Sequence, residues 1–347
     1  MVQSMNLFLW SGELPVIHSL LDAALSARQE FFDLCHEAAF RIFNGFTEGC
    51  PALVVDLFAR TLVIHNYADA PDTAAELMTE AKAFLLARLP WVQAVVLKIR
   101  HGQTESERNG TLVYGERPDR KIREHGVWYA IDLMMNRDSS FYADTRNLRA
   151  WARAHLEGKT VLNLFAYTGS LGIAAQAGGA ARVVQLDLSR RFLNVAKESC
   201  TLNGFPIRKS DFIVGDFWPK ISFLKRSGQL FDCVLLDPPF FSSTSKGTVQ
   251  TQNETPRLIN KVRPLVQDEG ALVVVNNALF LSGAEYVHTL EQLCEDGYLA
   301  IERLIPVPAD FAGYPETTVT PLPVDPAPFN HPTKIAVLRV RRKKKQG

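Results

Sequence analysis

Three aspartates stand at or just after apolar runs typical of buried strands: Asp187, Asp216 and Asp237. The carboxyl ends of parallel strands meet at one edge of a sheet, where open α/β folds bind their ligands. A carboxylate at Asp187 could accept two hydrogen bonds from a ribose diol, although Asp187 or Ser189 could instead cap the next helix. Asp216, followed by Phe217, could hold the amine and stack on the ring of a purine, and a surface turn is the alternative.

The third aspartate opens the segment Asp237-Pro238-Pro239-Phe240, which follows the apolar residues 231–236. Two prolines fix a rigid corner and remove two backbone donors, so carbonyl groups and the Asp237 side chain remain as acceptors. Such acceptors suit a planar amino or imino group, and Phe240 could stack on the base that carries it. We interpret these four residues as the candidate catalytic group.

Residues 161–169, VLNLFAYTG, predict a strand that runs into a turn and opens a helix. Gly169 would let a ligand approach the backbone closely. Phe165 and Tyr167 occupy the first two glycine positions of the dinucleotide pattern GxGxxG, which disfavours a pyrophosphate and with it a nicotinamide oxidoreductase. A nucleoside with less phosphate character fits better, and a tight turn without a ligand is the alternative.

The elements that must position these residues begin at about residue 143. Short strands are predicted between helices, at residues 160–165, 181–187, 211–214, 231–236, 271–276, 298–305 and 334–340. This alternation indicates an α/β fold with a doubly wound, mostly parallel sheet. Residues 306–333 contain eight prolines, which argues against a helix or central strand and predicts a long loop.

The first part of the chain predicts a smaller α+β domain. Helices are predicted at residues 14–34 and 72–89, and strands at residues 40–44, 52–56, 61–66, 92–100 and 111–114. For a chain of 347 residues, two domains are expected. We divide it into a helical lead-in (1–34), a small α+β domain (35–124), a bridging β-hairpin (125–142) and a larger domain (143–347).

The composition is that of an ordinary globular protein, with 38 Lys+Arg, 37 Asp+Glu and 47% hydrophobic residues. Apolar stretches are too short to cross a membrane, and the N-terminus lacks a signal-peptide pattern, so we expect a cytoplasmic protein. The five cysteines have no CxxC spacing, so we expect reduced thiols and no metal site.

Basic residues gather in two places. Residues 339–347 contain six basic residues and no acid, which fits either a phosphate contact or a solvated terminus. Residues 98–123 also carry several lysines and arginines, and a solvated face is the alternative to RNA binding there.

The four motifs occur in the order and spacing of class I S-adenosylmethionine-dependent methyltransferases. Residues 140–146 (SFYADTR), 163–169 (NLFAYTG) and 236–240 (LDPPF) resemble the bacterial large-subunit ribosomal RNA methyltransferases of types I and K. Residues 39–45 (AFRIFNG) and 51–56 (PALVVD) resemble the small central domain of type I. The resemblance spans about residues 20–280 and implies a Rossmann-like, seven-stranded methyltransferase domain preceded by a smaller α+β domain.

The resemblance also implies S-adenosyl-L-methionine as the cofactor. Phe165, Tyr167 and Gly169 would line its methionine part. Asp187 would take the ribose, and Asp216 with Phe217 the adenine. Asp144 and Arg146 would close over the cofactor, with Arg146 steadying its carboxylate, and Asp237 would lie between methyl donor and acceptor. The full predicted set is Asp144, Arg146, Asn163, Phe165, Ala166, Tyr167, Thr168, Gly169, Asp187, Leu188, Ser189, Asp216, Phe217 and Asp237.

Two features depart from the family pattern. The matching part starts near residue 20, so we expect the N-terminal PUA-type RNA-binding module of type I to be missing. Where type I has a cysteine nucleophile, this chain has Asn276 and Asn277. Methylation of cytosine C5 needs such a nucleophile, so we favour a nitrogen acceptor, as in the guanine N7 enzymes of type K.

We therefore predict an enzyme that methylates a base of structured, ribosomal RNA by direct transfer. One alternative is a small-molecule or protein acceptor, which the mildly acidic body of the chain favours. Another is an RNA-binding protein with a vestigial pocket, against which the intact aspartates argue. The residues leave open the acceptor atom, the nucleotide position and the oligomeric state.

Overall fold

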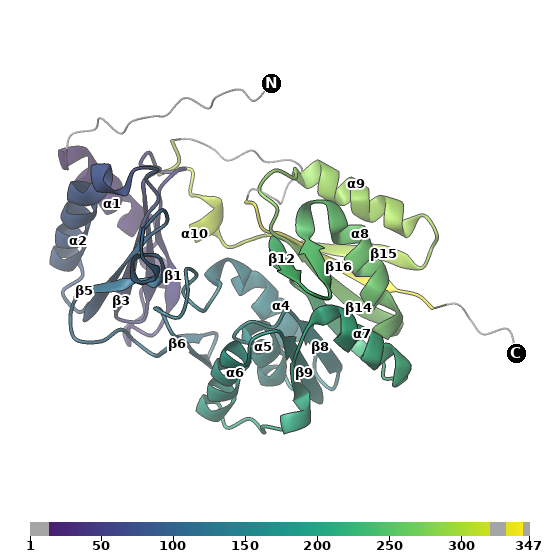
Figure 1. The fold of residues 1–347 in the computed structure, drawn as a ribbon. Helices are drawn as coiled ribbons and strands as arrows, with labels where there is room; N and C mark the ends of the chain where they lie inside the picture. Colours follow the sequence, from purple (N-terminus) through teal and green to yellow (C-terminus); the bar gives the residue numbers. More distant parts are fainter. Residues whose placement is uncertain (1–13, 320–330, 343–347) are drawn as a thin grey trace, which may run out of the picture. The chain divides into compact units, whose positions relative to one another are not determined.

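The computed structural model describes residues 14–319 and 331–342 of the chain (Figure 1). These residues form two compact units, each assembled from separate stretches of sequence. The described residues of the first unit are 14–122, 132–139 and 313–319, and those of the second are 123–131, 140–312 and 331–342. In the described part of the chain, no helix has the length and apolar character needed to span a membrane.

The first unit contains a five-stranded sheet in sequence order: β1 (Ala39–Asn44), β2 (Leu53–Phe58), β3 (Thr61–Asn66), β4 (Ala94–Ile99) and β5 (Thr111–Tyr114). Neighbouring strands are antiparallel except β3 and β4, which are parallel. Helix α2 (Ala75–Arg88) connects these two strands, as a parallel pair requires. Helix α1 (Leu14–Ala27) and α2 bury Leu21 and Leu85 in one core with Leu53 and Leu62 of the sheet.

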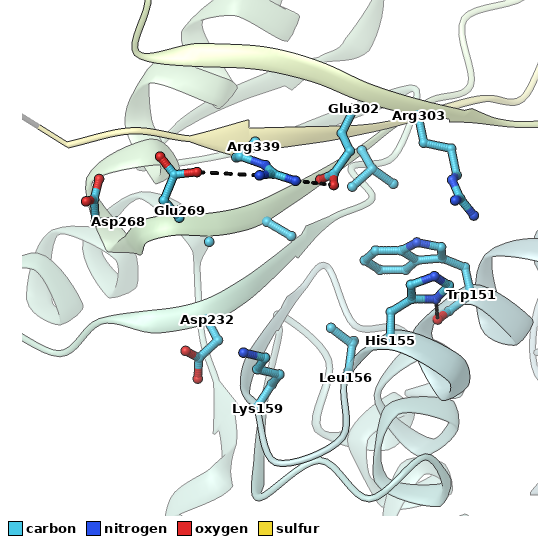
Figure 2. Close-up of a pocket in the computed structure, with 13 residues that line it drawn as sticks. Trp151, His155, Leu156, Lys159, Asp232, Asp268, Glu269, Glu302, Arg303 and Arg339 are labelled. Carbon is cyan, nitrogen blue, oxygen red and sulfur yellow. Dashed lines mark hydrogen bonds and ion pairs between the residues drawn. The ribbon is translucent and has the colours of Figure 1, made fainter.

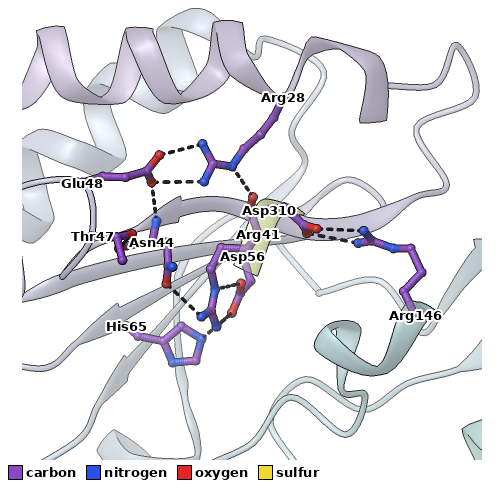
Figure 3. Close-up of polar contacts among 9 residues, drawn as sticks. All are labelled: Arg28, Arg41, Asn44, Thr47, Glu48, Asp56, His65, Arg146 and Asp310. Atoms are coloured by element: carbon purple, nitrogen blue, oxygen red, sulfur yellow. Dashed lines mark hydrogen bonds and ion pairs between the residues drawn. The ribbon is translucent and has the colours of Figure 1, made fainter. Parts of the chain in front are cut away.

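Buried ion pairs connect the segments of the first unit (Figure 3). Arg28 donates two hydrogen bonds to the Glu48 carboxylate, at 2.9 and 3.1 Å. Arg41 of β1 lies opposite Asp56 of β2 in register and binds it at 2.8 Å, and His65 of β3 approaches the same carboxylate at 3.2 Å. Burial alone would raise the pKa of Asp56, but Arg41 and His65 bring it well below its usual value.

Two predicted elements of the first part of the chain differ in extent. The helix predicted over residues 14–34 ends at Ala27, because Arg28 leaves the helical conformation (φ −109°, ψ 14°) and a 3₁₀ turn, Gln29–Phe31, follows. The hairpin predicted over residues 125–142 is shorter and begins earlier. Its strands are β6 (Lys121–Glu124) and β7 (Val127–Ala130), joined at His125 and Gly126, which both have positive φ, as tight hairpin turns require.

The second unit contains a seven-stranded sheet with the order β10-β9-β8-β11-β14-β16-β15. Its strands are β8 (Thr160–Leu164), β9 (Arg182–Asp187), β10 (Phe212–Val214), β11 (Phe231–Leu236), β14 (Val266–Asn276), β15 (Leu299–Ile305) and β16 (Lys334–Val340). The five strands β10, β9, β8, β11 and β14 are parallel to one another, and β16 is antiparallel to both of its neighbours, β14 and β15. The prediction of a seven-stranded, mostly parallel Rossmann-like sheet is confirmed.

Helices cover both faces of this sheet because its side chains alternate between two cores (Figure 1). In β8, Leu162 and Leu164 belong to the core formed with α7 (Phe217–Arg226), α8 (Thr251–Val262) and α9 (Gly283–Cys294). Val161 belongs to the core formed with α4 (Arg146–His155) and α5 (Ser170–Ala177). Strands buried on both faces are mostly apolar, which is why the sequence predicts them well.

Two features of the second unit differ from prediction or were not predicted. The proline-rich segment 306–333 contains a helical turn, α10 (Ala309–Ala312), because Pro308 directly precedes the turn and leaves its donors undisturbed. Residues 320–330 of this segment lie outside the described residues, as do residues 343–347 of the basic tail. A hairpin of β12 (Phe241–Thr244) and β13 (Gly247–Gln250), which the sequence pattern did not indicate, follows the Asp-Pro-Pro-Phe segment.

Candidate active site

The predicted site residues lie at the carboxyl ends of four neighbouring strands. From β8 the chain moves outward to β9 and β10, and it then returns to β11 on the other side of β8. This reversal is the switch point at which open α/β sheets form a ligand crevice. Residues 165–169 follow β8, residues 187–189 close β9, residues 216–217 follow β10, and residues 237–240 follow β11. The topology thus brings all four motifs to one edge.

The loop after β8 has an unusual backbone. Phe165, Tyr167 and Gly169 have φ values of 55°, 52° and 80°, so every second residue is left-handed. For the two aromatic residues this conformation costs about 1–3 kcal/mol each. Neighbouring segments hold the loop: the Tyr167 amide donates to Asp187 Oδ2 at 2.8 Å, and the Thr168 hydroxyl donates to the Ser140 carbonyl at 2.6 Å. Strain kept in place by such contacts is typical of a functional loop.

Gly169 opens helix α5 at a place where no side chain fits. A Cβ there would lie 2.5 Å from Cβ of Ala196 and 2.6 Å from Oε1 of Gln185. Gln185 in turn accepts a hydrogen bond from the buried Asn163 at 3.3 Å. Asn163 and Ala166 are both buried, so they support the loop from its buried side.

Asp187 is buried at the end of β9, where two amides orient its carboxylate. Oδ2 accepts from Tyr167 and Oδ1 accepts from Ser189, both at 2.8 Å. Burial raises the pKa of Asp187 and these amides oppose that effect. The Ser189 hydroxyl caps α6 (Arg190–Leu202), so Asp187, the residue predicted to bind the ribose, is not the helix cap. Leu188, between them, is exposed to solvent.

Asp216 has structural partners at both carboxylate oxygens. Oδ1 accepts from the Trp218 amide at 2.9 Å and caps α7, while Oδ2 accepts from the hydroxyl of Thr244 in β12. The ring of Phe217 is only 4% exposed and stacks on Phe165 with centroids 4.8 Å apart. The two predicted cofactor residues Phe165 and Phe217 therefore lie together, but Phe217 offers little free ring surface to a base.

Asp144 lies in the turn that precedes α4, and Arg146 is the first residue of that helix. Thr333 donates to Asp144 Oδ2 at 2.7 Å. Arg146 donates two hydrogen bonds to Asp310 of α10, at 2.8 and 3.1 Å, in a buried ion pair (Figure 3). The guanidinium predicted to steady a cofactor carboxylate is thus already bound to a carboxylate of the chain itself.

Asp237 directly follows β11, at the carboxyl edge of the sheet. Its Oδ1 accepts from the Asn277 amide at 3.2 Å, and its Oδ2 has no hydrogen-bond partner among residues 14–319 and 331–342. Burial and the negative charge of Asp144 raise the pKa of Asp237 to about 7, against a smaller lowering by Asn277. A carboxylate with such a pKa can take up a proton near neutral pH.

The segment after Asp237 presents an aromatic ring to solvent. Pro238 is buried and Pro239 exposed, and Phe240 has 42% of its surface exposed. Other large exposed apolar side chains follow neighbouring strands or lead into the site: Phe241, Leu279, Phe280, Leu188 and Tyr142. Exposed rings beside hydrogen-bond acceptors suit a planar base.

Together, these side chains fit a cationic nucleoside better than a phosphate-bearing one. Asp144, Asp187 and Asp237 supply carboxylates, and Arg146, the cation closest in sequence to Asp144, is paired with Asp310. The crowded glycine at residue 169 also allows a ligand close to the backbone. Among the described residues, we find no group of three or more His, Cys, Asp or Glu side chains arranged to hold a metal ion.

A hollow of about 410 Å³ lies at the opposite edge of the sheet, at the amino ends of the parallel strands (Figure 2). Trp151 and His155 of α4 stack at 5.2 Å on one side of it. Its carboxylates have partners: Arg339 pairs with Glu302 and Glu269, and the Asp268 side chain accepts from the Arg342 amide. None of the predicted site residues lines this hollow.

Several contacts at the carboxyl edge could not be found from local sequence patterns. Thr333 reaches Asp144, Asp310 reaches Arg146, and Asn277 reaches Asp237 over separations of 189, 164 and 40 residues. Only Asn277 had a sequence indication, because it stands where related enzymes have a cysteine.

Comparison with known proteins gives consistent matches. The family model described as S-adenosylmethionine-dependent methyltransferase matches residues 72–311. Ribosomal RNA large subunit methyltransferase I of Aeromonas salmonicida is 32% identical over 59% of this chain and 52% of its own length. The protein of the same name from Escherichia coli O139:H28 is 28% identical over 58% of this chain and 52% of its own length. The chain thus spans about half the length of these curated relatives.

Solved structures share the fold. The protein SMU.776, described as a methyltransferase complexed with SAH, has a TM-score of 0.82 at 20% identity, over 95% of this chain and 82% of its own. The SAM-dependent methyltransferase from Agrobacterium tumefaciens has a TM-score of 0.60 at 19% identity, over 87% of this chain and 90% of its own. At these identities the likeness concerns the fold.

Proposed function

The chain belongs to the S-adenosylmethionine-dependent methyltransferase family, and from this premise we propose that it methylates a base nitrogen of ribosomal RNA by direct transfer. The observation that carries this proposal is the corner at the end of β11. There Asp237 has one oxygen without a partner among the described residues, and an exposed ring, Phe240, follows two prolines. This arrangement suits a flat base that bears a hydrogen-bond donor.

In the proposed reaction, the cofactor supplies a methyl group already activated by its sulfonium charge. The chain's own residues bind and orient the reactants, which accounts for most of the acceleration in such a transfer. Asp187 holds the ribose hydroxyls, and the loop of residues 165–169 approaches the methionine part. Asp237 accepts a hydrogen bond from the acceptor, and Phe240 stacks on its ring.

The cysteines support nitrogen over cytosine C5 as the acceptor. Methylation of cytosine C5 requires a cysteine thiolate that attacks the ring. A thiolate forms where the pKa of the thiol is lowered. Burial raises the pKa of Cys200 and of Cys50 to about 11, and it also raises the pKa of Cys233 and Cys294. Cys233 lies inside β11.

Ribosomal RNA as the substrate is supported by the names of the curated relatives. The test incubates the purified protein with cofactor labelled in its methyl group and with separate pools of ribosomal RNA, protein and small metabolites. We expect label in the RNA pool, with a rate that falls steeply as salt rises because phosphate contacts release counterions. Label in the metabolite or protein pool alone would overturn RNA as the acceptor. The same substrate would place the enzyme in the cytoplasm.

The choice of acceptor atom has its own test. RNA containing 5-fluorocytidine traps enzymes that attack the cytosine ring through cysteine, since the covalent intermediate cannot lose fluorine. We expect no covalent adduct on a denaturing gel and a nitrogen-methylated nucleoside in the digested product. A stable adduct would contradict transfer to nitrogen.

The cofactor site is tested separately by calorimetry. Asp187→Ala removes the carboxylate that two backbone amides orient at 2.8 Å. Losing a charge-assisted hydrogen bond should weaken cofactor binding by about 1.5–3 kcal/mol, roughly tenfold or more in Kd. An unchanged Kd would exclude Asp187 from the site.

A further inference from the structure

The loop after β14 holds Asn277 in a fixed position. The preceding residue, Asn276, is fully buried and donates at 3.0 Å both to the Thr251 carbonyl and to the Thr255 hydroxyl. The Asn276 side-chain oxygen also accepts from the Ala278 amide at 2.9 Å. These bonds fix the backbone on both sides of Asn277, so its side chain reaches Asp237 from a rigid support.

A second set of contacts fixes Asp144, the other carboxylate that acts on Asp237. The ammonium group of Lys334 in β16 donates to the carbonyls of Ala278 and Pro332, at 2.9 and 2.6 Å. Thr333, between Pro332 and Lys334, donates to Asp144 Oδ2 at 2.7 Å. One lysine therefore fastens the loop that carries Asn277 and the segment that orients Asp144.

We infer that Asn277 is a positioning residue that holds Oδ1 of Asp237, so that Oδ2 alone is presented to an N–H group of the acceptor base. Asp144 is the opposing partner in this arrangement, because its negative charge favours the protonated form of Asp237. The inference rests on the proposed function and sharpens it, since the acceptor nitrogen must then carry a hydrogen. Exocyclic amines and ring imino groups meet this condition, whereas guanine N7 has no hydrogen to lose.

The step balances as follows for an acceptor with an N–H bond. The nitrogen lone pair forms the new N–C bond while the S–C bond of the cofactor breaks and leaves its electron pair on sulfur. The N–H proton passes to Oδ2 of Asp237, whose neutral carboxyl group then releases it to water. Asn277 keeps Oδ1 occupied throughout, so the proton has one acceptor oxygen.

The charges around Asp237 support this role. Burial and Asp144 raise the pKa of Asp237 to about 7, and the Asn277 hydrogen bond lowers it. The other charged or titratable groups on the surrounding elements have partners of their own: Lys334 binds two carbonyls, Arg146 binds Asp310, Glu285 caps α9, and His331 accepts from the Thr333 amide at 3.2 Å. Asp144 and Asn277 therefore act on Asp237 in opposite directions.

Two substitutions exploit this opposition. Asn277→Ala removes the hydrogen bond and should raise the pKa of Asp237. The acid limb of the profile of kcat against pH should therefore move to higher pH, by about 0.5–1 pH unit. Asp144→Asn keeps a side chain that Thr333 can bind but removes its charge, so the limb should move down by a similar amount. Asp296→Asn, an exposed residue bonded to the Tyr298 amide at 2.9 Å, is the matched charge control and should leave the limb in place.

The amplitude of the Asn277 effect distinguishes positioning from general structural damage. At pH 7 we expect kcat of Asn277→Ala to fall roughly tenfold with KM within threefold, because the proton acceptor is misoriented and protonated. Asn277→Gln, which keeps an amide donor, should recover part of kcat. Equal losses in both variants, or a loss that appears only in KM, would overturn the inference.

A direct titration keeps the inference separate from the proposed function. The chemical shift of the Asp237 carboxyl carbon, followed by ¹³C NMR against pH, needs no acceptor and no turnover. Opposite displacements of the Asp237 titration in Asn277→Ala and Asp144→Asn support the arrangement even if RNA proves to be the wrong substrate. Displacement in the same direction, or none in either variant, overturns it even if RNA is methylated.

Discussion

Each of the two edges of the seven-stranded sheet has an aspartate at one end of β11, and the pKa values of these two aspartates are shifted in opposite directions. At the amino end of β11, Asp232 accepts from the amide and the hydroxyl of Thr160, at 2.7 and 2.8 Å. Although burial alone would raise its pKa, these bonds lower it. At the carboxyl end of the same strand, the pKa of Asp237 is raised to about 7. Only five positions along the chain separate the hydrogen-bonded carboxylate of Asp232 from the carboxylate of Asp237, which can take up a proton near neutral pH.

The hollow at the amino edge has a defined volume, about 410 Å³, but its carboxylates have partners. Arg339 pairs with Glu302 and Glu269, and the Asp268 side chain binds a backbone amide (Figure 2). The carboxyl edge instead has a strained loop, exposed rings and a carboxylate oxygen without a partner among the described residues. Perturbed groups that remain unsatisfied are a better guide to chemistry than cavity volume.

The largest expected difference between the edges concerns catalysis. Asp237→Asn should lower kcat by about 10²–10⁴-fold, the usual contribution of a positioned proton acceptor. Cofactor binding measured by calorimetry should change little. Asp232→Asn makes the same chemical change at the other end of β11 and should leave kcat within twofold. Similar losses in both variants would mean that the strand, and not its carboxyl end, is sensitive.

A second difference concerns backbone crowding. Gly169→Ala places a Cβ 2.5 Å from Ala196 at a φ of 80° and should lower the free energy of unfolding by about 2–4 kcal/mol. Gly158→Ala, in the turn before β8 at the amino edge, has a φ of 68° but no atom within 4 Å of the new Cβ. It should cost only about 1 kcal/mol, the left-handed penalty alone. Denaturant unfolding of both variants gives the comparison, and equal costs would show that crowding at Gly169 is unimportant.

The contributions of Asp232, in β11, and of Asp237, which follows β11, to the free energy of unfolding should change with pH in opposite directions. The folded-state pKa of Asp237 lies above the usual value for aspartate. The negative charge of Asp237 therefore destabilises the fold above pH 7, and this destabilisation is absent well below pH 4. Asp237→Asn should therefore raise the free energy of unfolding at pH 8 by about 1–3 kcal/mol, and by less at pH 5. Asp232, with its lowered pKa, stabilises the fold above the usual pKa of aspartate and loses this effect as pH falls through its folded value. Asp232→Asn should thus destabilise at pH 8, by about 1 kcal/mol.

The smallest expected effect is at the amino-edge ion pairs. Arg339 and its partners Glu302 and Glu269 are substantially exposed, with side-chain exposures of 43%, 43% and 53%. Pairs of this kind contribute about 0.2–1 kcal/mol, and salt weakens them further. Arg339→Gln should lower the melting temperature only slightly and leave cofactor binding unchanged. A large loss of activity in this variant would show that the amino edge takes part in function.

The sequence predicted what depends on local pattern. The bounds of β11 and β16 agree with the sequence prediction, because each is a short, mostly apolar run of strand length that is buried in the middle of the sheet. The Asp-Pro-Pro-Phe segment was likewise placed at a strand end, where the structure has it. The hairpin after it was not foreseen, because its strands β12 and β13 are short and largely polar.

The partners of the site residues could not be predicted, because they come from distant parts of the chain. No pattern around Arg146 indicates Asp310, which lies in a proline-rich segment whose helical turn α10 was itself unexpected. The stack of Phe217 on Phe165 is similar: the sequence suggested a ring for a purine, and tertiary packing used that ring within the core. Local rules identify chemical groups, but only the fold decides which groups remain available.

The loop after β8, in which every second residue has a left-handed conformation, limits how this protein can be stabilised by mutation. Replacing Tyr167 by Asn or Gly would relieve an unfavourable backbone conformation, so selection for heat resistance should repeatedly choose this position. The same replacement would remove a ring that packs against Phe192 and Tyr142. Variants enriched for thermal tolerance at residue 167 should therefore be enriched for poor enzymes.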